Sequence, residues 1–367
     1  MRTITVERAP NDGLLPDFAA HSETADAAFP QDPHWMAALR HALMPGQLDL
    51  FVLREGTVAV GLLPLTPTSL KTGGMRVRMM GTPMDRSVDL TDALLLPSHR
   101  RADVLSAALS DLTREYPWDL IRFRRVRQRS HLLDALHGLE YRYSLVDAGA
   151  SASCDVSSTD ALTALSREQL RNVARLRRRA ERDYGPVTTE TIADSTVADA
   201  SFDRFVALES VGWKGADPAG TSLALDAQAQ AFFRDVMKRL QPFGRARIDF
   251  LSIGGRDAAA QLAVRAGHSW FILKIGYHPD FRDVGPGSLL LKAFVEEMCR
   301  ASDVREVSLT TNPPWAARWH FRTEPTYDVL IYGRTWRGRA LAAGRIGKEF
   351  LKSIRHRLPT RSDTATK

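Results

Sequence analysis

Two glycines stand directly before a helical pattern in the second half of this 367-residue chain. We expect a strand to end near Tyr277, and after the loop Arg282-Asp283-Val284-Gly285-Pro286-Gly287 we expect a helix to begin at about Ser288. Glycine lets a ligand approach the backbone closely, and the N–H groups at a helix start, backed by the helix dipole, bind phosphate. The loop therefore predicts a pyrophosphate site, with a simple turn capped by Ser288 as the alternative.

A lysine and two further polar residues precede this loop. Lys274 stands within the apolar run Trp270–Ile275, which has the pattern of a buried strand. A charged amine in that position needs an anion or a carboxylate partner, so Lys274 is a candidate ligand-binding residue. Tyr277 and His278 follow at the expected strand end, where a phenol and an imidazole could exchange protons with a ligand. An ordinary loop histidine before Pro279 is the plainer interpretation of His278.

Sequence motifs of hydrolases, zinc enzymes and nucleotide-binding proteins are absent. The chain contains no GxSxG, HExxH, GxxxxGKS/T or GxGxxG sequence, and its ten histidines are scattered without ligand spacing. Its two cysteines, Cys154 and Cys299, form no CxxC pair. We therefore expect no catalytic triad, no metal and no disulfide framework.

Hydrophobic periodicity predicts a mixed order of strands and helices. In the first half we expect strands at 49–53, 57–65, 75–80, 119–126 and 141–146, and helices at 100–116 and 130–137. The small polar residues 147–158 are expected to form a linker. In the second half we expect strands at 187–192, 247–253, 258–264, 269–277, 306–309 and 326–332, and helices at 159–184, 199–211, 226–240 and 289–299.

The two halves repeat one order of elements: a hairpin, a third strand, a helix and a strand. The segments LDLFVLREGTVAVGLLPL and ARIDFLSIGGRDAAAQLAV align with their turn glycines in register, which indicates an internal duplication. We predict an α/β (α+β) protein with an N-terminal domain over 1–150, a C-terminal domain over 151–333 and a basic helical tail over 334–367.

The sequence Arg282-x-x-Gly285-x-Gly287, between a strand and an amphipathic helix, resembles the acyl-CoA pyrophosphate loop of the GNAT N-acyltransferases. The surrounding pattern resembles in particular the bacterial CelD/BcsL type, which is similar to FemAB-like double-domain transferases. Supporting stretches are the Lys-x-x-Tyr run before the loop, the blocks 209–215 (ESVGWKG) and 220–222 (GTS), and, in the first half, Trp35, 61–65 (GLLPL) and 118–119 (WD). The resemblance covers about residues 30–333.

This resemblance implies the fold, the donor and most of the site. It implies tandem GNAT-like domains, each a mixed, largely antiparallel twisted sheet flanked by helices, with the first domain catalytically silent. The donor would be an acyl-CoA, in the first place acetyl-CoA, and the acceptor an amine such as an amino sugar or a lipid-linked cell-envelope precursor. The implied roles are catalysis for Glu209, Tyr277 and His278, donor binding for Arg282, Val284, Gly285, Gly287 and Ser288, and acceptor binding for Trp213, Lys214 and Lys274. Without the resemblance, Glu209 and Lys214 are typical of solvated surfaces, and Trp213 is typical of a core.

One stretch departs from the family pattern. Relatives commonly carry Thr-Gly-Asp-Glu-x-Tyr-Lys ahead of an Arg-Trp pair, whereas this chain has Thr310-Thr311-Asn312-Pro313-Pro314-Trp315-Ala316 ahead of Arg318-Trp319. The missing acidic and lysine side chains leave open a different acceptor, or a non-catalytic GNAT-fold component of a polysaccharide synthesis assembly. A FemAB-like transferase that uses aminoacyl-tRNA is a further alternative, because the basic runs 167–182 and 122–129 could follow a phosphate backbone.

The net charge of +7 resides in the last residues of the chain. Residues 334–367 hold ten Lys or Arg against two acidic residues, so the remainder is nearly neutral and nucleic acid is not the expected partner. Apolar residues of 335–358 fall on one helical face, which predicts either a helix on an anionic membrane surface or a helix docked on the body. Since there is no long apolar run and no signal peptide, we expect a cytoplasmic protein, peripheral to the inner face of the membrane if the tail binds lipid.

Overall fold

The computed structural model describes residues 3–10, 18, 28–83, 85–96, 101–158, 165–194, 198–211 and 222–344. The first half contains an N-terminal strand that the sequence analysis did not predict, followed by the expected hairpin, third strand, helix and strand. Its strands are β1 (Ile4–Arg8), β2 (Asp49–Glu55), β3 (Val58–Thr72), β4 (Met75–Gly81), β5 (Leu94–Leu95), β6 (Leu120–Arg127) and β7 (Tyr143–Asp155). Its helical segments are η2 (Phe29–Gln31), α1 (Pro33–Ala38), η3 (Leu39–Leu43), α2 (Arg101–Glu115) and α3 (His131–Leu136).

The second half follows the same order after three helices and an edge strand. Its helices are α5 (Arg167–Asp183), α6 (Ala198–Val211), α7 (Ala227–Leu240), α8 (Pro286–Met298) and α9 (Trp336–Ala342), with short turns η5 (Leu223–Leu225), η6 (Gln241–Phe243), η7 (Pro279–Val284) and η8 (Pro314–Trp319). Its strands are β8 (Val187–Ile192), β9 (Ala246–Ile253), β10 (Arg256–Ala266), β11 (Ser269–Tyr277), β12 (Glu306–Ser308) and β13 (Arg322–Tyr332).

The described strands of both halves form one continuous sheet. The strand order is β1-β2-β3-β4-β6-β13-β7-β12-β11-β10-β9-β8, with β5 paired to β3 at the side. Most neighbours are antiparallel, and the exceptions are the parallel pairs β4·β6 and β11·β12, each bridged by one helix. A parallel pair requires such a crossover, so α2 and α8 hold equivalent places in the two halves. The mixed, mostly antiparallel sheet with flanking helices confirms the predicted fold class.

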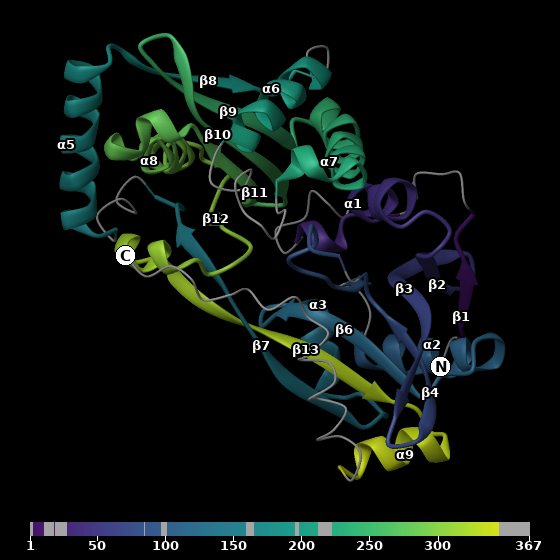
Figure 1. The fold of residues 1–367 in the computed structure, drawn as a ribbon. Helices are drawn as coiled ribbons and strands as arrows, with labels where there is room; N and C mark the ends of the chain where they lie inside the picture. Colours follow the sequence, from purple (N-terminus) through teal and green to yellow (C-terminus); the bar gives the residue numbers. More distant parts are fainter. Residues whose placement is uncertain are drawn as a thin grey trace.

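Each half gives its last strand to the other half. β7 ends the first half yet pairs with β12, and β13 ends the second half yet pairs with β6, so the two exchanged strands lie next to each other at the centre of the sheet. Figure 1 shows β7 and β13 running side by side between the upper half, with α5 to α8, and the lower half, with α2 and α3. The predicted boundary at residue 150 falls inside β7.

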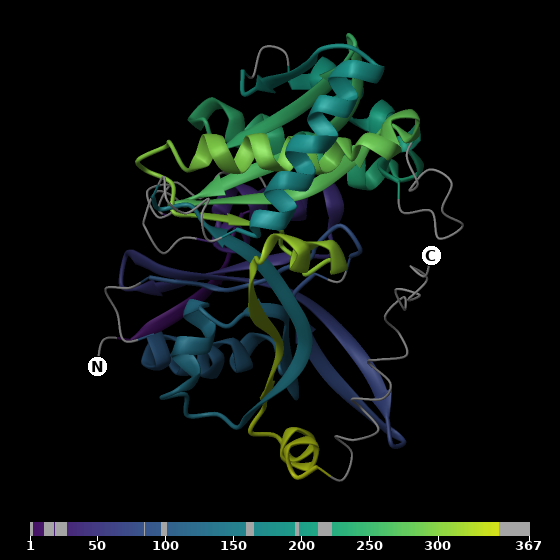
Figure 2. The same ribbon diagram turned by 90° about the vertical axis from the view of Figure 1, so that its left-hand side faces the viewer.

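Helices cover the sheet where their apolar stripes face it. In α7, for example, Asp226 caps the first turn and the buried residues Phe232, Phe233, Val236, Met237 and Leu240 recur at helical spacing. α6 and α7 share one buried cluster with α1 of the first half, whereas α8 and α5 cover the opposite face of β9 to β11. In Figure 2, α5 and α8 lie on the side of the upper sheet that faces the viewer. Strand β11 thus has a helix layer on each face.

Three predictions of local structure are wrong. The helix predicted over 159–184 begins only at Arg167, with Ser166 as its N-cap. The predicted linker over 147–158 is strand as far as Asp155, because its small residues pair with β13 on one side and with β12 on the other. The helix after the glycine loop begins at Pro286, not at Ser288, and its N-cap is Gly285. Of the predicted basic tail, the described part is helix α9, in which Leu341 is buried and Trp336 is exposed, and residues 345–367 lie outside the described part.

Candidate active site

Strands β11 and β12 separate from each other towards the glycine loop. They pair only over Ser269 to Phe271 and Glu306 to Ser308, after which the chain turns at Thr310 and bonds to Ala152 of β7. Residues 272–277 of β11 therefore have no strand partner on that side within the described part of the chain. The opening leaves backbone N–H and C=O groups at the strand edge for a ligand.

A β-bulge lies at the point where the two strands separate. On the β10 side, Ile272 opposes Ala263 and Lys274 opposes Leu262, so Leu273 is the extra residue. The bulge places Leu273 and Lys274 on the same face as α7: Leu273 packs against the cluster that contains α7, and the Lys274 amine lies 5.1 Å from the ring centroid of Phe233. Bulges beside active sites re-aim side chains in this way.

The predicted phosphate loop is built as a short helical turn leading into α8. Gly285 has φ +58° and a Cβ there would lie 3.1 Å from Leu176 of α5, whereas a Cβ on Gly287 would meet nothing within 4 Å. The Ser288 N–H donates to the Gly285 carbonyl (2.9 Å), so it serves the first turn, and Val284 is fully buried. Pro286 has no N–H, and the Ser288 and Leu289 N–H groups both donate to the Gly285 carbonyl, so the Gly287 N–H is the group of this first turn that a ligand could bind, through the open space beside it. The loop fits a pyrophosphate.

Charged side chains fix the outer side of this loop. Asp283 accepts hydrogen bonds from Arg179 of α5 (2.5 Å) and from the Tyr184 hydroxyl (3.0 Å). Arg282 is exposed, and its carbonyl accepts the Gly285 N–H (3.3 Å). The exposed face of the arginine-rich α5 therefore adjoins the loop, in a position to contact further phosphate groups of a bound donor.

Glu209 lies behind the same strand, in a tight contact that one glycine permits. A Cβ on Gly276 of β11 would lie 2.9 Å from the Glu209 Cα, so glycine is required for α6 to lie this close to β11. The Glu209 carboxylate is buried and accepts hydrogen bonds from the Ser222 hydroxyl and the Leu223 N–H, both at 2.9 Å. The structure thus brings Glu209 to the face of β11 that carries Lys274. Tyr277 instead packs against the cluster that contains α8.

His278 has a structural part in the loop. Its Nδ1 accepts the Asp280 N–H (3.2 Å) and thereby caps the turn that carries Arg282. An imidazole that accepts a hydrogen bond at Nδ1 carries its proton on Nε2 when neutral, so Nε2 can only donate a hydrogen bond to a ligand. The predicted Trp213 and Lys214, with the whole segment 212–221, lie outside the described residues.

A cavity of about 480 Å³ opens between the two halves. We call it the junction cavity. Ser269 and Phe271 of β11 line it, on the same face as Leu273, together with Glu306 of β12. The first half contributes Gln31, Asp92, Arg127, Arg129, Ser130 and His131. Glu209, Lys274 and Tyr277 are not among its described lining residues.

The sequence analysis missed Asp92, a buried carboxyl group in the wall of the junction cavity. It accepts hydrogen bonds from Ser130 (2.6 Å), the Ala93 N–H (2.8 Å) and Gln31 (3.1 Å). Burial raises the pKa of Asp92 to about 7. A carboxyl group with this pKa can hold or release a proton near neutral pH. No local pattern in the sequence marks it, since its partners come from segments 61 and 38 residues away.

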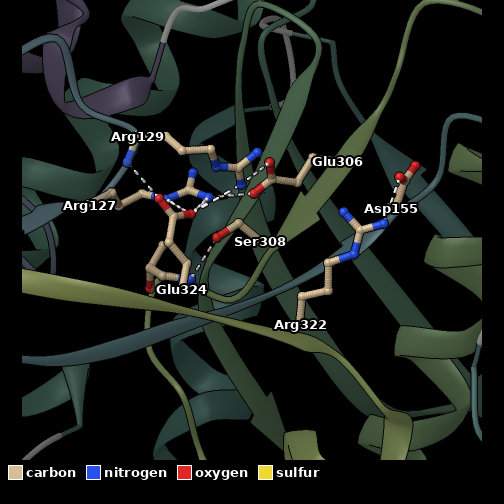
Figure 3. Close-up of polar contacts among 8 residues, drawn as sticks. Arg127, Arg129, Asp155, Glu306, Ser308, Arg322 and Glu324 are labelled. Carbon is tan, nitrogen blue, oxygen red and sulfur yellow. Dashed lines mark hydrogen bonds and ion pairs between the residues drawn. The ribbon is translucent and has the colours of Figure 1, made fainter. Parts of the chain in front are cut away.

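A network of arginines and glutamates joins the halves at the cavity floor. Figure 3 shows Arg127 and Arg129, at the end of β6, reaching Glu306 of β12 and Glu324 of β13. Arg127 lies 2.6 Å from Glu306, and Arg129 lies 3.1 Å from Glu324. The Arg127 side chain is 11 % exposed and that of Glu324 is 9 % exposed, so these pairs are largely shielded from water.

Other kinds of site find no support in the described residues. These residues contain no cluster of three or more His, Cys, Asp or Glu side chains that could hold a metal. Cys154 and Cys299 are buried and unbonded to each other, and burial raises the pKa of the Cys154 thiol to about 12. Among the helices that the structure describes, none is long and apolar enough to cross a membrane.

Solved structures of known proteins share this fold at low sequence identity. FemX has a TM-score of 0.60 at 11 % identity, over 89 % of this chain and 97 % of its own. A conserved protein of unknown function from Bacteroides thetaiotaomicron has 0.57 at 10 % identity, over 90 % and 100 %. The C-terminal domain of a putative lysylphosphatidylglycerol synthetase from Agrobacterium fabrum has 0.52 at 11 % identity, over 90 % and 96 %. No curated protein sequence matches the chain.

The family described as Acetyltransferase (GNAT) domain matches residues 167–319, from the start of α5 to the end of η8. The match covers the separated strands, the glycine loop and α8, and it agrees with the GNAT resemblance of the sequence; it does not specify the CelD/BcsL type. Residues 167–319 therefore form a GNAT acetyltransferase domain, and the chain is an acyltransferase of the GNAT fold.

Proposed function

We propose that this protein transfers an acyl group from acyl-CoA to an amine. The observation that carries the proposal is the opening between β11 and β12, with a bulge at its inner end and the glycine loop of α8 at its outer end. A thioester donor is long and has a pyrophosphate at one end. The phosphate end suits the Gly287 N–H, and the acyl end suits the strand edge near Leu273.

The chemistry requires a neutral amine nitrogen to attack the thioester carbonyl carbon, so that a C–N bond forms and the C–S bond breaks. The amine loses a proton and the thiolate gains one. We assign Tyr277 to protonate the thiolate, since it stands at the strand end beside the loop. Glu209 is the candidate base, because its buried carboxylate lies on the face of β11 to which the bulge turns Lys274. His278 is less suited to that part, since its Nδ1 is engaged.

We place the amine acceptor in the junction cavity. The cavity adjoins Phe271, two residues before the bulge and on the same strand face, which corresponds to about 7 Å along a strand. Its polar lining suits a small polar molecule such as an amino sugar or the amine-bearing part of a cell-envelope precursor. Lys274, Trp213 and Lys214 remain candidates for the acceptor side.

Of the two basic runs that suggested the aminoacyl-tRNA alternative, 167–182 keeps exposed arginines on α5, whereas the run 122–129 is largely occupied by carboxylates. In the basic run 122–129, Arg127 and Arg129 are occupied by Glu306 and Glu324, and Arg122 pairs with Asp328. A surface that follows a nucleic acid needs unpaired cations. The non-catalytic alternative rests on the departure at Thr310–Ala316, where Ala316 is buried in η8.

One experiment separates these possibilities. The purified protein is titrated with acetyl-CoA by calorimetry and is then incubated with acetyl-CoA and a panel of amines, with free CoA and N-acyl product measured by mass spectrometry. We expect acetyl-CoA binding and amine-dependent CoA release without added tRNA. Binding without release for any amine would favour the non-catalytic alternative, and activity that requires aminoacyl-tRNA would overturn the choice of donor.

We also propose that the basic tail brings the enzyme to an anionic membrane surface. Removal of residues 345–367 leaves α9 in place, so it tests the tail without disturbing the described fold. We expect the intact protein, and not the shortened one, to bind vesicles that contain anionic lipid at low salt, because each cation near such a surface contributes about 1 kcal/mol. Equal binding by both proteins would contradict this.

A further inference from the structure

Five arginines occur within eight positions: four in strand β6 and one, Arg129, two residues after its end. Ile121, Phe123 and Val126 of this strand belong to the buried cluster under α2 and α3. The five arginines, which we call the arginine ladder, take no part in that cluster: Arg122, Arg124, Arg125, Arg127 and Arg129.

Four of these arginines have carboxylate partners. Arg122 pairs with Asp328, Arg125 with Asp89 (3.7 Å), and Arg127 and Arg129 with Glu306 and Glu324. Five cations thus meet four anions, and the ladder has one positive charge in excess.

The excess charge belongs to Arg124. Within the described residues its guanidinium has no hydrogen bond and no ion pair, and its Nε is buried. Burial and the neighbouring Arg122 lower the pKa of Arg124, and Arg125 lowers it further, whereas Asp328 acts in the opposite direction. A half-buried guanidinium that has no direct hydrogen-bond partner has lost part of its hydration without gaining an equivalent contact, which is costly.

The backbone around Arg124 is held firmly beside the junction cavity. The Arg124 N–H donates to the hydroxyls of Thr82 (3.0 Å) and Thr91 (3.1 Å); Thr91 lines the cavity, whereas Arg124 lies next to it and is not among its described lining residues. The next residue, Arg125, has φ +47°, and Asp89 links it to Thr310, which has φ +57°. Two residues of unfavourable backbone conformation, Arg125 next to Arg124 and Thr310, are thus linked through Asp89 where the halves meet, and such residues cluster at ligand sites.

We propose that Arg124 binds a carboxylate or phosphate group of the acceptor. The guanidinium supplies two parallel N–H donors to such a group, and the bound anion completes the charge balance of the ladder. The assignment of this group to the acceptor rests on the proposed function, whereas anion binding at Arg124 does not. The basic run 122–129 thus recognises one anionic group instead of a nucleic-acid backbone.

The test measures thermal unfolding in sodium phosphate, sodium acetate and sodium chloride at equal ionic strength. We expect phosphate or acetate at about ten times its dissociation constant to raise the Tm of the wild-type protein by about 2 °C above its value in chloride. The anion that acts distinguishes a phosphate site from a carboxylate site. Arg124→Gln should lose the rise and, in chloride, should melt no lower than wild type, because it removes an unpaired charge.

Three control variants make the result specific. Arg76→Gln removes an exposed arginine of the same sheet and should keep the rise. Gly287→Val should also keep it, which excludes anion binding at the glycine loop. Arg124→Lys keeps the charge and should retain part of the rise. The proposal is overturned if wild type shows no rise, or if Arg124→Gln keeps it. The CoA affinity of Arg124→Gln, measured in parallel, should equal that of the wild-type protein. If the wild-type protein does not bind CoA at all, that result counts against the proposed function and not against anion binding at Arg124.

Discussion

The two halves of the sheet contain the same strand–helix–strand unit, yet only one of them opens. In the first half, β4 and β6 pair at Met79 to Gly81, the end of β4 that leads to the crossover, and the Thr82 N–H continues the pairing. In the second half, β11 and β12 pair at the opposite end of β11 and separate towards the crossover. Equal topology therefore gives a closed strand pair in one half and an open one in the other.

The two segments that connect the parallel strands, from β4 to β6 and from β11 to β12, also differ in their suitability for ligand binding. No glycine occurs between Gly81 and Gly138, so the start of α2 lacks the close backbone access that Gly285 and Gly287 give to α8. The longer first crossover instead places Asp92 in the junction cavity. Under the proposed function, the second half would bind the donor and the first half would supply walls and charges for the acceptor.

The strongest disruption should come from separating the halves. Arg127→Met leaves Glu306 and Glu324 largely buried with one cation fewer, which should lower the free energy of unfolding by about 3–5 kcal/mol. Arg322→Met breaks the exposed pair with Asp155 in the same region and should cost about 0–1 kcal/mol (Figure 3). Urea unfolding measures both, and equal losses would show that burial does not decide the strength of the junction.

The next effect concerns the donor. Gly287→Val places a β-branched side chain in the open space beside the helix start, so we expect acetyl-CoA affinity to fall by about a hundredfold, or about 2–3 kcal/mol. Gly287→Ala should cost less, since its side chain is smaller. Calorimetry gives the affinities, and the Tm should change little because nothing in the protein occupies that space. Undiminished affinity in the valine variant would remove the donor from this loop.

Substitution of one glycine in each half tests whether close packing against the strand is special to the second half. Gly276→Ala forces the new Cβ against the Glu209 backbone, so we expect a loss of about 1–3 kcal/mol in stability and a displacement of α6. Gly81→Ala, at the end of β4, meets only a carbonyl at 3.5 Å and should be almost neutral. Denaturant titration of the two variants decides the matter. Similar losses would mean that the close approach of α6 to β11 is not special to the second half.

The last effect is a pH dependence that originates in the first crossover and is spread over several pH units. Burial raises the pKa of Asp92 from its ordinary value of 3.8 to about 7 in the folded protein, so between these pH values the folded state keeps a proton that the unfolded state has released. The free energy of unfolding should therefore fall as pH rises, by at most about 1.4 kcal/mol per pH unit, and level off above pH 7.

Asp92→Asn should flatten that slope in urea titrations between pH 4.5 and 8. Asp280→Asn, in the second crossover, is the matched control. Asp280 is exposed and Arg256 lowers its pKa, so the slope should remain. An unchanged slope in Asp92→Asn would show that Asp92 stays ionised.

Local chemistry made the second crossover predictable from sequence. Glycine residues directly before a helix indicate either a turn or a ligand-binding loop. The hydrophobic period predicted β11 at its observed bounds, Ser269 to Tyr277. The helix start moved by two residues because Pro286 favours the first helical position, which leaves Gly285 as the cap.

Features that depend on distant partners were beyond the sequence. Asp92 acquires its unusual pKa from contacts with Gln31 and Ser130, and the arginine ladder acquires its balance from carboxylates up to 206 residues away. The residues 147–155 of β7 are small and polar, and their side-chain types therefore suggested a linker. They form a strand because neighbouring strands pair with both of its edges. Hydrophobic periodicity predicts local secondary structure. It does not predict that β13 pairs between β6 and β7, because that pairing joins residues far apart in the sequence.

The exchanged strands have a consequence for biosynthesis. The gap between β6 and β7 is filled only by β13, so the first half keeps an incomplete sheet until residue 332 has been made. At about 5–20 residues per second, the 177 residues between the ends of β7 and β13 require about 10–35 s, during which unpaired strand edges are open to other chains. The protein must therefore fold as one cooperative unit late in translation, and ribosomes that stall within the second half will release an aggregation-prone intermediate.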